Sequence, residues 1–273
     1  MNFERFRVQK HIEMSLGCND LDNWHSYRDK LEEYSISNAE DDVLKEKLTL
    51  DSEDLFYKGV ISLSEALAEL SKGQSSWPVV KLYYSVFYFL RASLACKGFS
   101  LVRNRSQYLL EIKTGEKPIK KSSTRYRNDH TSVINIYKDI VGENDILQTN
   151  TIAGQSVYDW LMKKRHQINY NQRGFLEPEH NDFLHEAINS ITNDGFNELL
   201  DSYIKDDTPL YCFDLDHACI AAPLKRAFLT KNDLIQSGIE VFSEEKVQVI
   251  KNILLTGISS SSLVYDLVEV SKC

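Results

Sequence analysis

The residues best suited to chemistry lie together in one short segment, KKRHQINYNQRGF, which spans residues 163 to 175. Arg165 offers the forked guanidinium donors that hold a phosphate group, and His166 offers an imidazole, which transfers protons near neutral pH. Tyr170 is a poorer proton carrier there, because a phenol gives up its proton only in alkaline solution. Arg165, His166 and Tyr170 are therefore the candidate catalytic residues.

The same segment also suits binding to RNA without chemistry. Arg165, Asn169 and Arg173 follow one another at four-residue steps, so they form one polar stripe if the helix continues that far. Guanidinium and amide groups on one side of a helix match the oxygens of an RNA backbone. Asn169 and Arg173 are therefore candidate nucleic-acid-binding residues.

A purely structural role is the alternative for this segment. Arg165 would then pair with an acid such as Asp159 or Glu177. Tyr170 would anchor the end of the helix, and His166 would only be solvated. The sequence alone leaves catalysis, binding and this structural role open.

A second candidate is a basic segment with interleaved aromatic residues. Its bases are Lys113, Lys117, Lys120, Lys121, Arg125 and Arg127. Clustered bases near Tyr108 and Tyr126 can follow a phosphate backbone and stack on nucleobases, whereas a solvated loop is the alternative. His130 closes the segment and becomes a second catalytic candidate only if the fold returns it to Arg165.

Composition indicates a globular protein whose surface as a whole does not bind nucleic acid. The chain has 273 residues, of which 42% are hydrophobic and 26% charged, so it can bury a sizeable core. Its net charge is −8 and its pI is about 5.4. Because nucleic-acid-binding surfaces carry a basic excess, only a local basic patch is compatible with this balance.

The sequence predicts a cytoplasmic protein with no membrane contact. Its first residues, MNFERFRVQKHIEM, are charged throughout and contain no apolar core of signal-peptide length. The longest apolar run, WPVVKLYYSVFYFL, is interrupted by Lys81 and is shorter than the roughly 20 residues of a membrane span. The five cysteines are odd in number and widely spread, which favours reduced thiols.

No metal and no cofactor is expected. YCFDLDHAC places metal-donor side chains within eight positions, at Cys212, Asp214, Asp216, His217 and Cys219. It lacks a Cys-x-x-Cys pair, however, and Cys219 enters an apolar run, so buried free thiols are the favoured interpretation. The sequence also contains no phosphate-cradling glycine motif and no nucleophile elbow.

The elements that must position these residues are mostly helices. RFRVQKHI is interpreted as a strand, followed by a short helix in DNWHSYRDKLEEYS. A helix over 52 to 72 is predicted to begin at Asp51 or Ser52 and to end at Gly73. The next helix, SSWPVVKLYYSVFYFLRASLACKG, is apolar on nearly every side and should be the central one, with its tyrosines in the core. Residues 99 to 130 predict a hairpin and then a basic loop.

The second half of the chain adds further helices. TSVINIYKDIV and QSVYDWLMKKRHQINY are predicted helices, and Ser156 with Asp159 has the spacing of a capping box in the latter. EHNDFLHEAINSITNDGFNELLDSYIK reads as one long helix. TPLYCFDLDHACIAAPLKRAFL is interpreted as irregular or as short elements, and SEEKVQVIKNILLTG and SSSLVYDLVEVSK as closing helices.

This pattern resembles the HEPN superfamily of helical bundles. VVKLYYSVFYFLRASLACKG, an intervening loop and YDWLMKKRHQINYNQRGFLEP look most like its YaaC-like and nucleotidyltransferase-associated members, over about residues 52 to 205. The resemblance implies a mainly α fold: an up-and-down bundle with a small β-hairpin or strand insertion. The expected parts are an N-terminal extension (1 to 50), the bundle (51 to 206) and a C-terminal helical subdomain or docked helices (207 to 273).

The resemblance implies a role with RNA. Members that cleave RNA carry Arg, four to six intervening residues and His on a helix at a dimer seam. Here the positions after Arg165 hold Tyr170, Asn171 and Gln172, and His166 is adjacent to Arg165, so the two point in different directions on a helix. The departure argues against cleavage; if cleavage occurs, the resemblance implies a metal-independent endoribonuclease.

We therefore expect an RNA-associated or nucleic-acid-associated protein of a bacterial stress, toxin-antitoxin or phage-defence system, self-associating as a dimer through the helix over 156 to 172. The defence context comes from the resemblance alone. The alternative is a non-enzymatic protein-interaction subunit whose helical face docks a partner enzyme.

Overall fold

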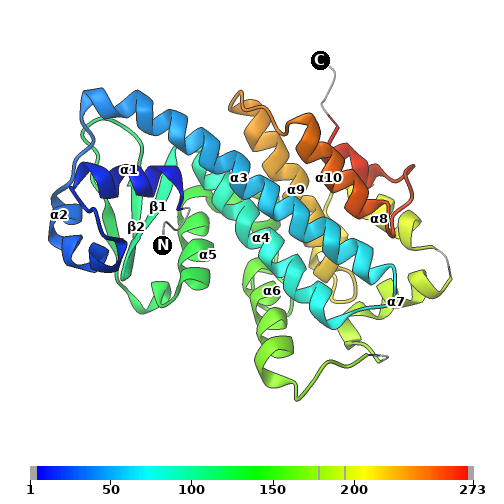
Figure 1. Ribbon diagram of the computed structural model, residues 1–273. Coiled ribbons are helices and arrows are strands. Elements are labelled where there is room, and N and C mark those ends of the chain that lie inside the picture. Colours follow the sequence, from blue (N-terminus) through cyan, green and yellow to red (C-terminus); the bar gives the residue numbers. More distant parts are fainter. Residues whose placement is uncertain (1–4, 178, 194, 270–273) are drawn as a thin grey trace.

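The computed structural model describes residues 5 to 269 except 178 and 194, and it is mainly helical with one small sheet (Figure 1). In these residues the helices are α1 (Arg7–Ser15), α2 (Arg28–Glu33), α3 (Asn38–Leu70), α4 (Ser76–Cys96), α5 (Asp129–Val141), α6 (Val157–His166), α7 (His185–Thr192), α8 (Phe196–Lys205), α9 (Ala218–Gln236) and α10 (Glu244–Leu254). The prediction of a mainly α fold with a small hairpin insertion is confirmed.

The sheet is a three-stranded antiparallel meander beside α1. β1 (Phe99–Asn104) pairs with β2 (Ser106–Glu111), and β2 pairs with β3 (Ile119–Lys121). Together with α1, α2 and the start of α3, this sheet encloses a small hydrophobic cluster that includes Val8, Leu31 and Tyr108. The N-terminal lobe formed in this way lies at one end of the molecule (Figure 1).

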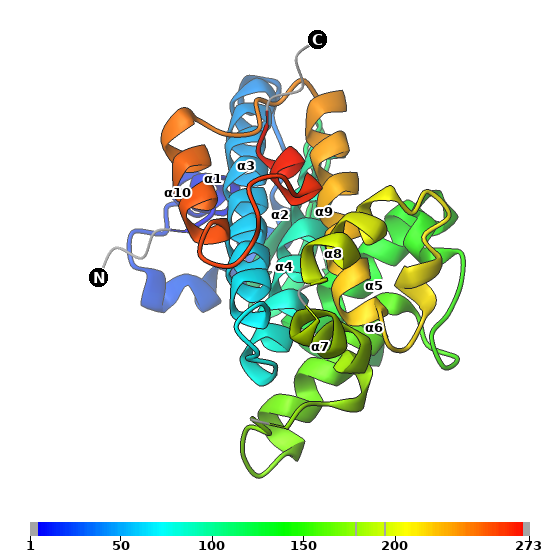
Figure 2. The same cartoon turned by 90° about the vertical axis from the view of Figure 1, so that its right-hand side faces the viewer.

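The main core surrounds α4. Its side chains are buried along nearly the whole helix, against α3 on one side and α9 on another. Figure 2 shows α9 and α10 on either side of α3. Among the described helices α4 alone has the length and apolar composition of a membrane span, but 72% of that window is buried inside the molecule. A core helix passes the same test.

The long helix α3 starts earlier than predicted. A capping box of Ser37 and Glu40 begins it, 14 residues before the expected start at Asp51 or Ser52. Asp51 does cap a helix, but a different one: its carboxylate accepts hydrogen bonds from the backbone amides of Arg7, at 2.8 Å, and Val8, at 3.0 Å. Asp51 thus satisfies the first turn of α1, whose own N-cap residue is Phe6 and has no capping side chain.

Other element predictions are also wrong. RFRVQKHI is not a strand but forms most of α1, in which Val8 and Ile12 lie one turn apart and are both buried. The long helix predicted from Glu179 is a 3-10 turn (Asp182–Leu184) followed by α7 and α8. The closing helix is a 3-10 turn (Leu263–Leu267), and its last predicted residues, 270 to 272, lie outside the described part of the chain.

The segment interpreted as irregular contains α9, a helix of 19 residues. Arg226 on α9 is 2% exposed and forms a buried polar network. Its guanidinium donates to the Tyr137 hydroxyl at 2.6 Å and the Ser93 hydroxyl at 3.1 Å, and it pairs with Asp145 at 3.4 Å and Asp233 at 3.2 Å. The network ties α9 to α4, α5 and the segment after α5.

Candidate functional site

Arg165 lies at the end of α6 and faces the aromatic surface of α4. One Nη donates a hydrogen bond of 3.0 Å to the Tyr84 hydroxyl. The guanidinium carbon lies 5.4 Å from the ring centres of Tyr84 and Tyr170 and 5.8 Å from that of Tyr83. Tyrosine rings therefore hold the guanidinium through cation–π contacts.

No carboxylate within salt-bridge distance neutralises Arg165 in the described residues. The two expected acids are engaged elsewhere: Asp159 pairs with Lys138 at 2.5 Å, and Glu177 binds the start of α4. The expected ion pair of Arg165 with one of these acids is therefore wrong. Arg165 Nε is also buried and has no hydrogen-bond partner among these residues.

Glu177 fixes the loop that follows α6 to the first turn of α4. Its carboxylate accepts from the backbone amides of Ser76, at 2.6 Å, and Ser75, at 2.8 Å, and from the Ser76 hydroxyl at 2.8 Å. Burial alone would raise the pKa of Glu177, but these hydrogen bonds outweigh it and lower the pKa to about 2. The loop over 172 to 177 is thereby held close to the Arg165 side of α4.

His130, at the start of α5, meets the same tyrosines as Arg165. Its Nδ1 is hydrogen-bonded to the Tyr83 hydroxyl at 2.9 Å, and its ring centre lies 4.8 Å from that of Phe87 and 5.6 Å from that of Tyr84. Burial, and next the charge of Arg165, lower the pKa of His130 below its usual value. The fold therefore does return a histidine, neutral at pH 7, to the surroundings of Arg165.

His166 and Tyr170 lie on the solvent side of the same helix end. Both are exposed, and their rings are 4.9 Å apart. The α-helix ends at His166 and is followed by one π-helical turn (Gln167–Asn171), so Arg173 lies beyond the helical stretch. The predicted stripe of Arg165, Asn169 and Arg173 is therefore not continuous.

The predicted basic segment is divided between two places. Lys113 and Lys117 are exposed on the β2–β3 loop, which is hydrogen-bonded to Ile36 in the N-terminal lobe. Lys120 pairs with Glu32 at 3.3 Å and Arg125 with Asp139 at 2.8 Å. Figure 1 shows the hairpin and α6 in different parts of the molecule, so Lys113 and Lys117 do not converge with Arg165.

The other part of the basic segment faces a hollow beside the hairpin. Lys121 and Arg127 line this hollow with Arg103 and Arg105. His130 and Tyr84 line an adjoining cleft of about 410 Å³ together with other residues of α4 and α5. Sequence reasoning named His130 only conditionally and assigned Tyr84 to the core. The adjacent tyrosines Tyr83 and Tyr84 are the one local signal that could have pointed to this cluster.

The cysteine-containing segment places two of its thiols in the core. Cys212 and Cys219 are buried free thiols, as predicted, and burial raises the pKa of each to about 12. Within the described ranges, no three His, Cys, Asp or Glu side chains are grouped closely enough to hold a metal ion. The groups that the structure places around Arg165 are phenols and an imidazole.

Comparisons of the chain with protein-family models, with curated proteins and with solved structures give no match.

Proposed function

We propose that this chain is an RNA-binding protein with a HEPN-like helical bundle, acting in the cytoplasm as part of a bacterial stress or phage-defence system. The observation that carries the RNA-binding proposal is the Arg165 guanidinium, which is held by Tyr84 beside His130 with no carboxylate partner among the described residues. The bundle type, the defence context and the dimer rest on the resemblance of residues 52 to 205.

The surroundings of Arg165 suit a phosphate group of a bound ligand, because no carboxylate of the described residues pairs with this arginine. A half-buried cation that lacks a counter-ion is costly unless a ligand supplies one. The guanidinium of Arg165 and the neutral imidazole of His130 offer a cation and a proton acceptor within one aromatic cluster. Tyr84 and Tyr170 add rings on which unpaired bases stack, which favours single-stranded RNA over a duplex.

Binding is tested by fluorescence anisotropy with a labelled single-stranded RNA at about 50 mM salt, where phosphate contacts are weakly screened. Arg165→Ala should weaken binding about tenfold or more, as expected for a lost charge-assisted hydrogen bond. Arg28→Ala, at an exposed arginine in α2, is the matched control. Arg165→Lys retains the charge and should lie between the wild type and Arg165→Ala. Absence of wild-type binding at this salt concentration would refute the proposal.

Metal-independent cleavage of RNA is the reaction that we propose for this site in addition to binding. The 2′-oxygen would bond to the adjacent phosphorus as its proton passes to His130 Nε2, and the bond from phosphorus to the 5′-oxygen would break. Arg165 would stabilise the developing negative charge. A proton from a second donor, for which Tyr170 or His166 is the candidate, would complete the leaving hydroxyl, giving a 2′,3′-cyclic phosphate and a 5′-hydroxyl end.

Cleavage is tested by incubating total RNA with a chelator and comparing the wild type with His130→Ala and His166→Ala. Loss of the products in only one variant identifies the histidine that moves the proton. Equal products from all three proteins would exclude both histidines. If the wild type binds RNA but gives no cleavage products, the chain is an RNA-binding protein without nuclease activity.

A docking role is the second candidate, because two aromatic rings near the start of α4 face solvent. Trp77 is 46% exposed and Phe175 is 60% exposed, with ring centres 6.2 Å apart. Trp77→Ala with Phe175→Ser should abolish association with a partner enzyme and leave RNA affinity unchanged if this role is correct. A partner complex that survives the double substitution rejects these rings as the docking face.

A further inference from the structure

Three adjoining hollows are lined by residues of the N-terminal lobe and of the helices α3, α4 and α5. Their volumes are about 940, 410 and 380 Å³, and the side chain of Arg103 lines all three. One contains Trp24 and Tyr57, the second contains Tyr84 and His130, and the third includes the basic loop after β3. We call the three together the basic cleft.

The basic cleft is positively charged although the chain as a whole carries a net charge of −8. Its cations are Arg5, Arg7, Lys10, Lys58, Arg91, Arg103, Arg105, Lys121 and Arg127, and its carboxylates are Asp51, Asp54 and Asp129. Such a local excess in an acidic protein focuses an attractive potential on anions.

All three carboxylates are already engaged. Arg7 pairs with Asp51 at 3.4 Å and with Asp54 at 2.6 Å, and Arg103 pairs with Asp129. Six of the cations have no carboxylate within 4.0 Å in the part of the chain that the structure describes: Lys10, Lys58, Arg91, Arg105, Lys121 and Arg127. The cleft therefore holds positive charge that the described residues do not neutralise.

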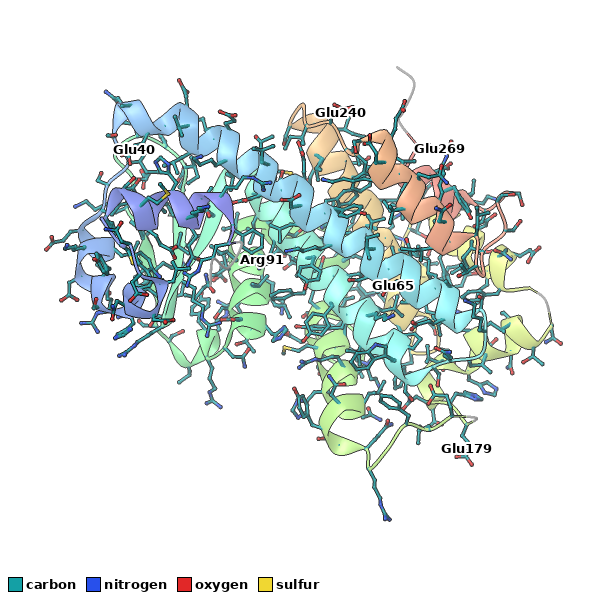
Figure 3. All side chains as sticks on the ribbon, viewed as in Figure 1. Glu40, Glu65, Arg91, Glu179, Glu240 and Glu269 are labelled. Atoms are coloured by element: carbon teal, nitrogen blue, oxygen red, sulfur yellow. The ribbon has the colours of Figure 1, made fainter. Side chains whose placement is uncertain are left out.

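Arg91 shows this imbalance most clearly. It projects from α4 between the N-terminal lobe and the bundle (Figure 3) and is half-buried. Its guanidinium carbon lies 4.3 Å from the ring centre of Phe6 and 5.8 Å from that of Phe87. Burial lowers the pKa of Arg91 to about 10, and Tyr88 and Asp51 only partly offset this effect. An arginine that stays charged in a cleft despite the cost of burial is suited to bind an anionic ligand.

Arg105 is held at the tip of the β1–β2 hairpin in a strained conformation. It is the single residue between the paired Asn104 and Ser106, with a φ of +55°. This left-handed region is unfavourable for an arginine, for which glycine would be the unstrained choice. Arg105 lines two of the hollows, so the strained hairpin tip places a positively charged residue at the wall of the cleft.

We infer that the basic cleft binds the phosphate backbone of single-stranded RNA and leads the strand to Tyr84 and His130. The inference rests on the proposed function and adds the path of the strand. The cations are spread along three hollows instead of meeting at one point, which suits the repeated charges of a polymer. Half-buried rings of Phe6, Tyr57 and Tyr88 also line the cleft and offer stacking surfaces for bases.

The test uses the full chain and a fluorescein-labelled single-stranded RNA of about 20 nucleotides, long enough to follow such a groove. Affinity is measured as a function of salt for the wild type, for Lys58→Gln with Arg105→Gln, and for Lys113→Gln with Lys117→Gln. All four side chains are exposed, and both double variants remove two positive charges. Lys113 and Lys117 line none of the three hollows, so they form the matched control.

Log affinity falls as log salt rises, and the loss of two phosphate contacts should make this slope about 1.4 less steep. It should also weaken binding about tenfold at about 100 mM salt. The control pair should change affinity less than about twofold, because distant charges are screened at this salt. A third variant, Arg91→Met, should weaken RNA binding relative to the wild type. Its circular dichroism spectrum shows whether it is folded. If Arg91→Met does not fold, the exposed pair decides alone.

The outcomes separate this inference from the proposed function. If the wild type binds RNA and Arg165→Ala weakens it, but the cleft pair behaves like the control pair, the cleft is not the path and the proposed function stands. Equal weakening by both pairs also overturns the inference, because it indicates a general charge effect. If the wild type does not bind RNA at all, both proposals fail together.

Discussion

His130 sits where a histidine is kept neutral. Its ring is packed against Phe87 and Tyr84 and shares two tyrosines with the guanidinium of Arg165. Both burial and a nearby positive charge disfavour the imidazolium form. The remaining nitrogen, Nε2, makes no hydrogen bond to other described residues. In the tautomer whose Nδ1–H donates to the Tyr83 hydroxyl, Nε2 can accept a proton, which is the arrangement expected of a general base.

The titration of His130 follows from this arrangement. Its folded pKa is lowered, so the unfolded chain binds this proton first as the pH falls. The imidazole therefore favours folding fully above pH 6.5 and progressively less as the pH falls from 6.5 through the folded value. An NMR titration should place the His130 pKa below that of an unfolded peptide, and Arg165→Met should raise it. An unchanged value in Arg165→Met would show that burial alone sets the shift.

The start of α4 depends on a single carboxylate from a distant part of the chain. Glu177 accepts two backbone amides there, as a capping residue does, although it lies about a hundred positions along the chain from them. The same contact fixes the loop after α6 and so helps to keep Arg165 against Tyr84. Helix capping and site geometry are coupled at this element.

Glu177→Gln should reduce the free energy of unfolding by about 1 kcal/mol at pH 7, as for the loss of a charged helix cap. The folded pKa of Glu177 is about 2, and its ordinary value is 4.5. The carboxylate therefore contributes fully above pH 4.5, and its contribution is lost as the pH falls towards 2. Urea denaturation should show a difference between the proteins that is constant from pH 7 to 5 and shrinks below pH 4.5. A gap that stays constant down to pH 3 would contradict this assignment.

The contact between α3 and α4 requires a glycine at one position. A Cβ added to Gly59 would lie 2.4 Å from a ring carbon of Phe89, well inside normal contact. Gly59→Ala should therefore destabilise the protein by about 1 to 2 kcal/mol, although the same change favours an isolated helix. Thermal denaturation of Gly59→Ala, Phe89→Leu and the double variant checks this. The double variant should be more stable than the sum of the single effects predicts, and strict additivity would argue against the clash.

The elements that sequence reasoning found are those whose signals are local. α4 carries Pro78 in its first turn and Gly98, with φ +87°, after its end, and both are local signals of helix boundaries. The start of α3 was misplaced because Asp51 is a good capping residue, but the amides that it caps belong to α1 and lie more than forty positions earlier, whereas the local capping box of Ser37 and Glu40 begins α3. α9 was missed because Pro223 and small residues lower its helix propensity, which burial against α4 overrides.

The candidate site was predictable only in part for the same reason. Arg165 and His130 were both identified as candidates, but their convergence depends on how α5 and α6 pack on α4. The cations of the basic cleft come from α1, α3, α4 and the hairpin, and no local pattern joins them. Lys121 and Arg127 were predicted from the basic segment, whereas the other cations of the cleft had no local signal.

At the scale of the whole molecule, α9 belongs to the same hydrophobic core as α3 and α4. Its buried residues pack with those of α4 and α6 in one continuous cluster, and Arg226 reaches across to α5 through Tyr137. Asp145, which is fully buried, accepts from Tyr158 on α6 and pairs with Arg226. The network therefore joins four helices at the centre of the protein, and its loss should destabilise the packing of all four.

Arg226→Met should lower the free energy of unfolding by about 3 to 5 kcal/mol, because Asp145 would be left buried without its cation. Asp145→Asn in the same chain removes the stranded charge while keeping an acceptor for the Tyr158 hydroxyl, so the double variant should recover a substantial part of the loss. Urea unfolding followed by far-ultraviolet circular dichroism measures both effects. The change should appear as an earlier single transition, because the network sits inside one shared core. A double variant no more stable than Arg226→Met would show that the loss comes from packing around Arg226 and not from the uncompensated carboxylate.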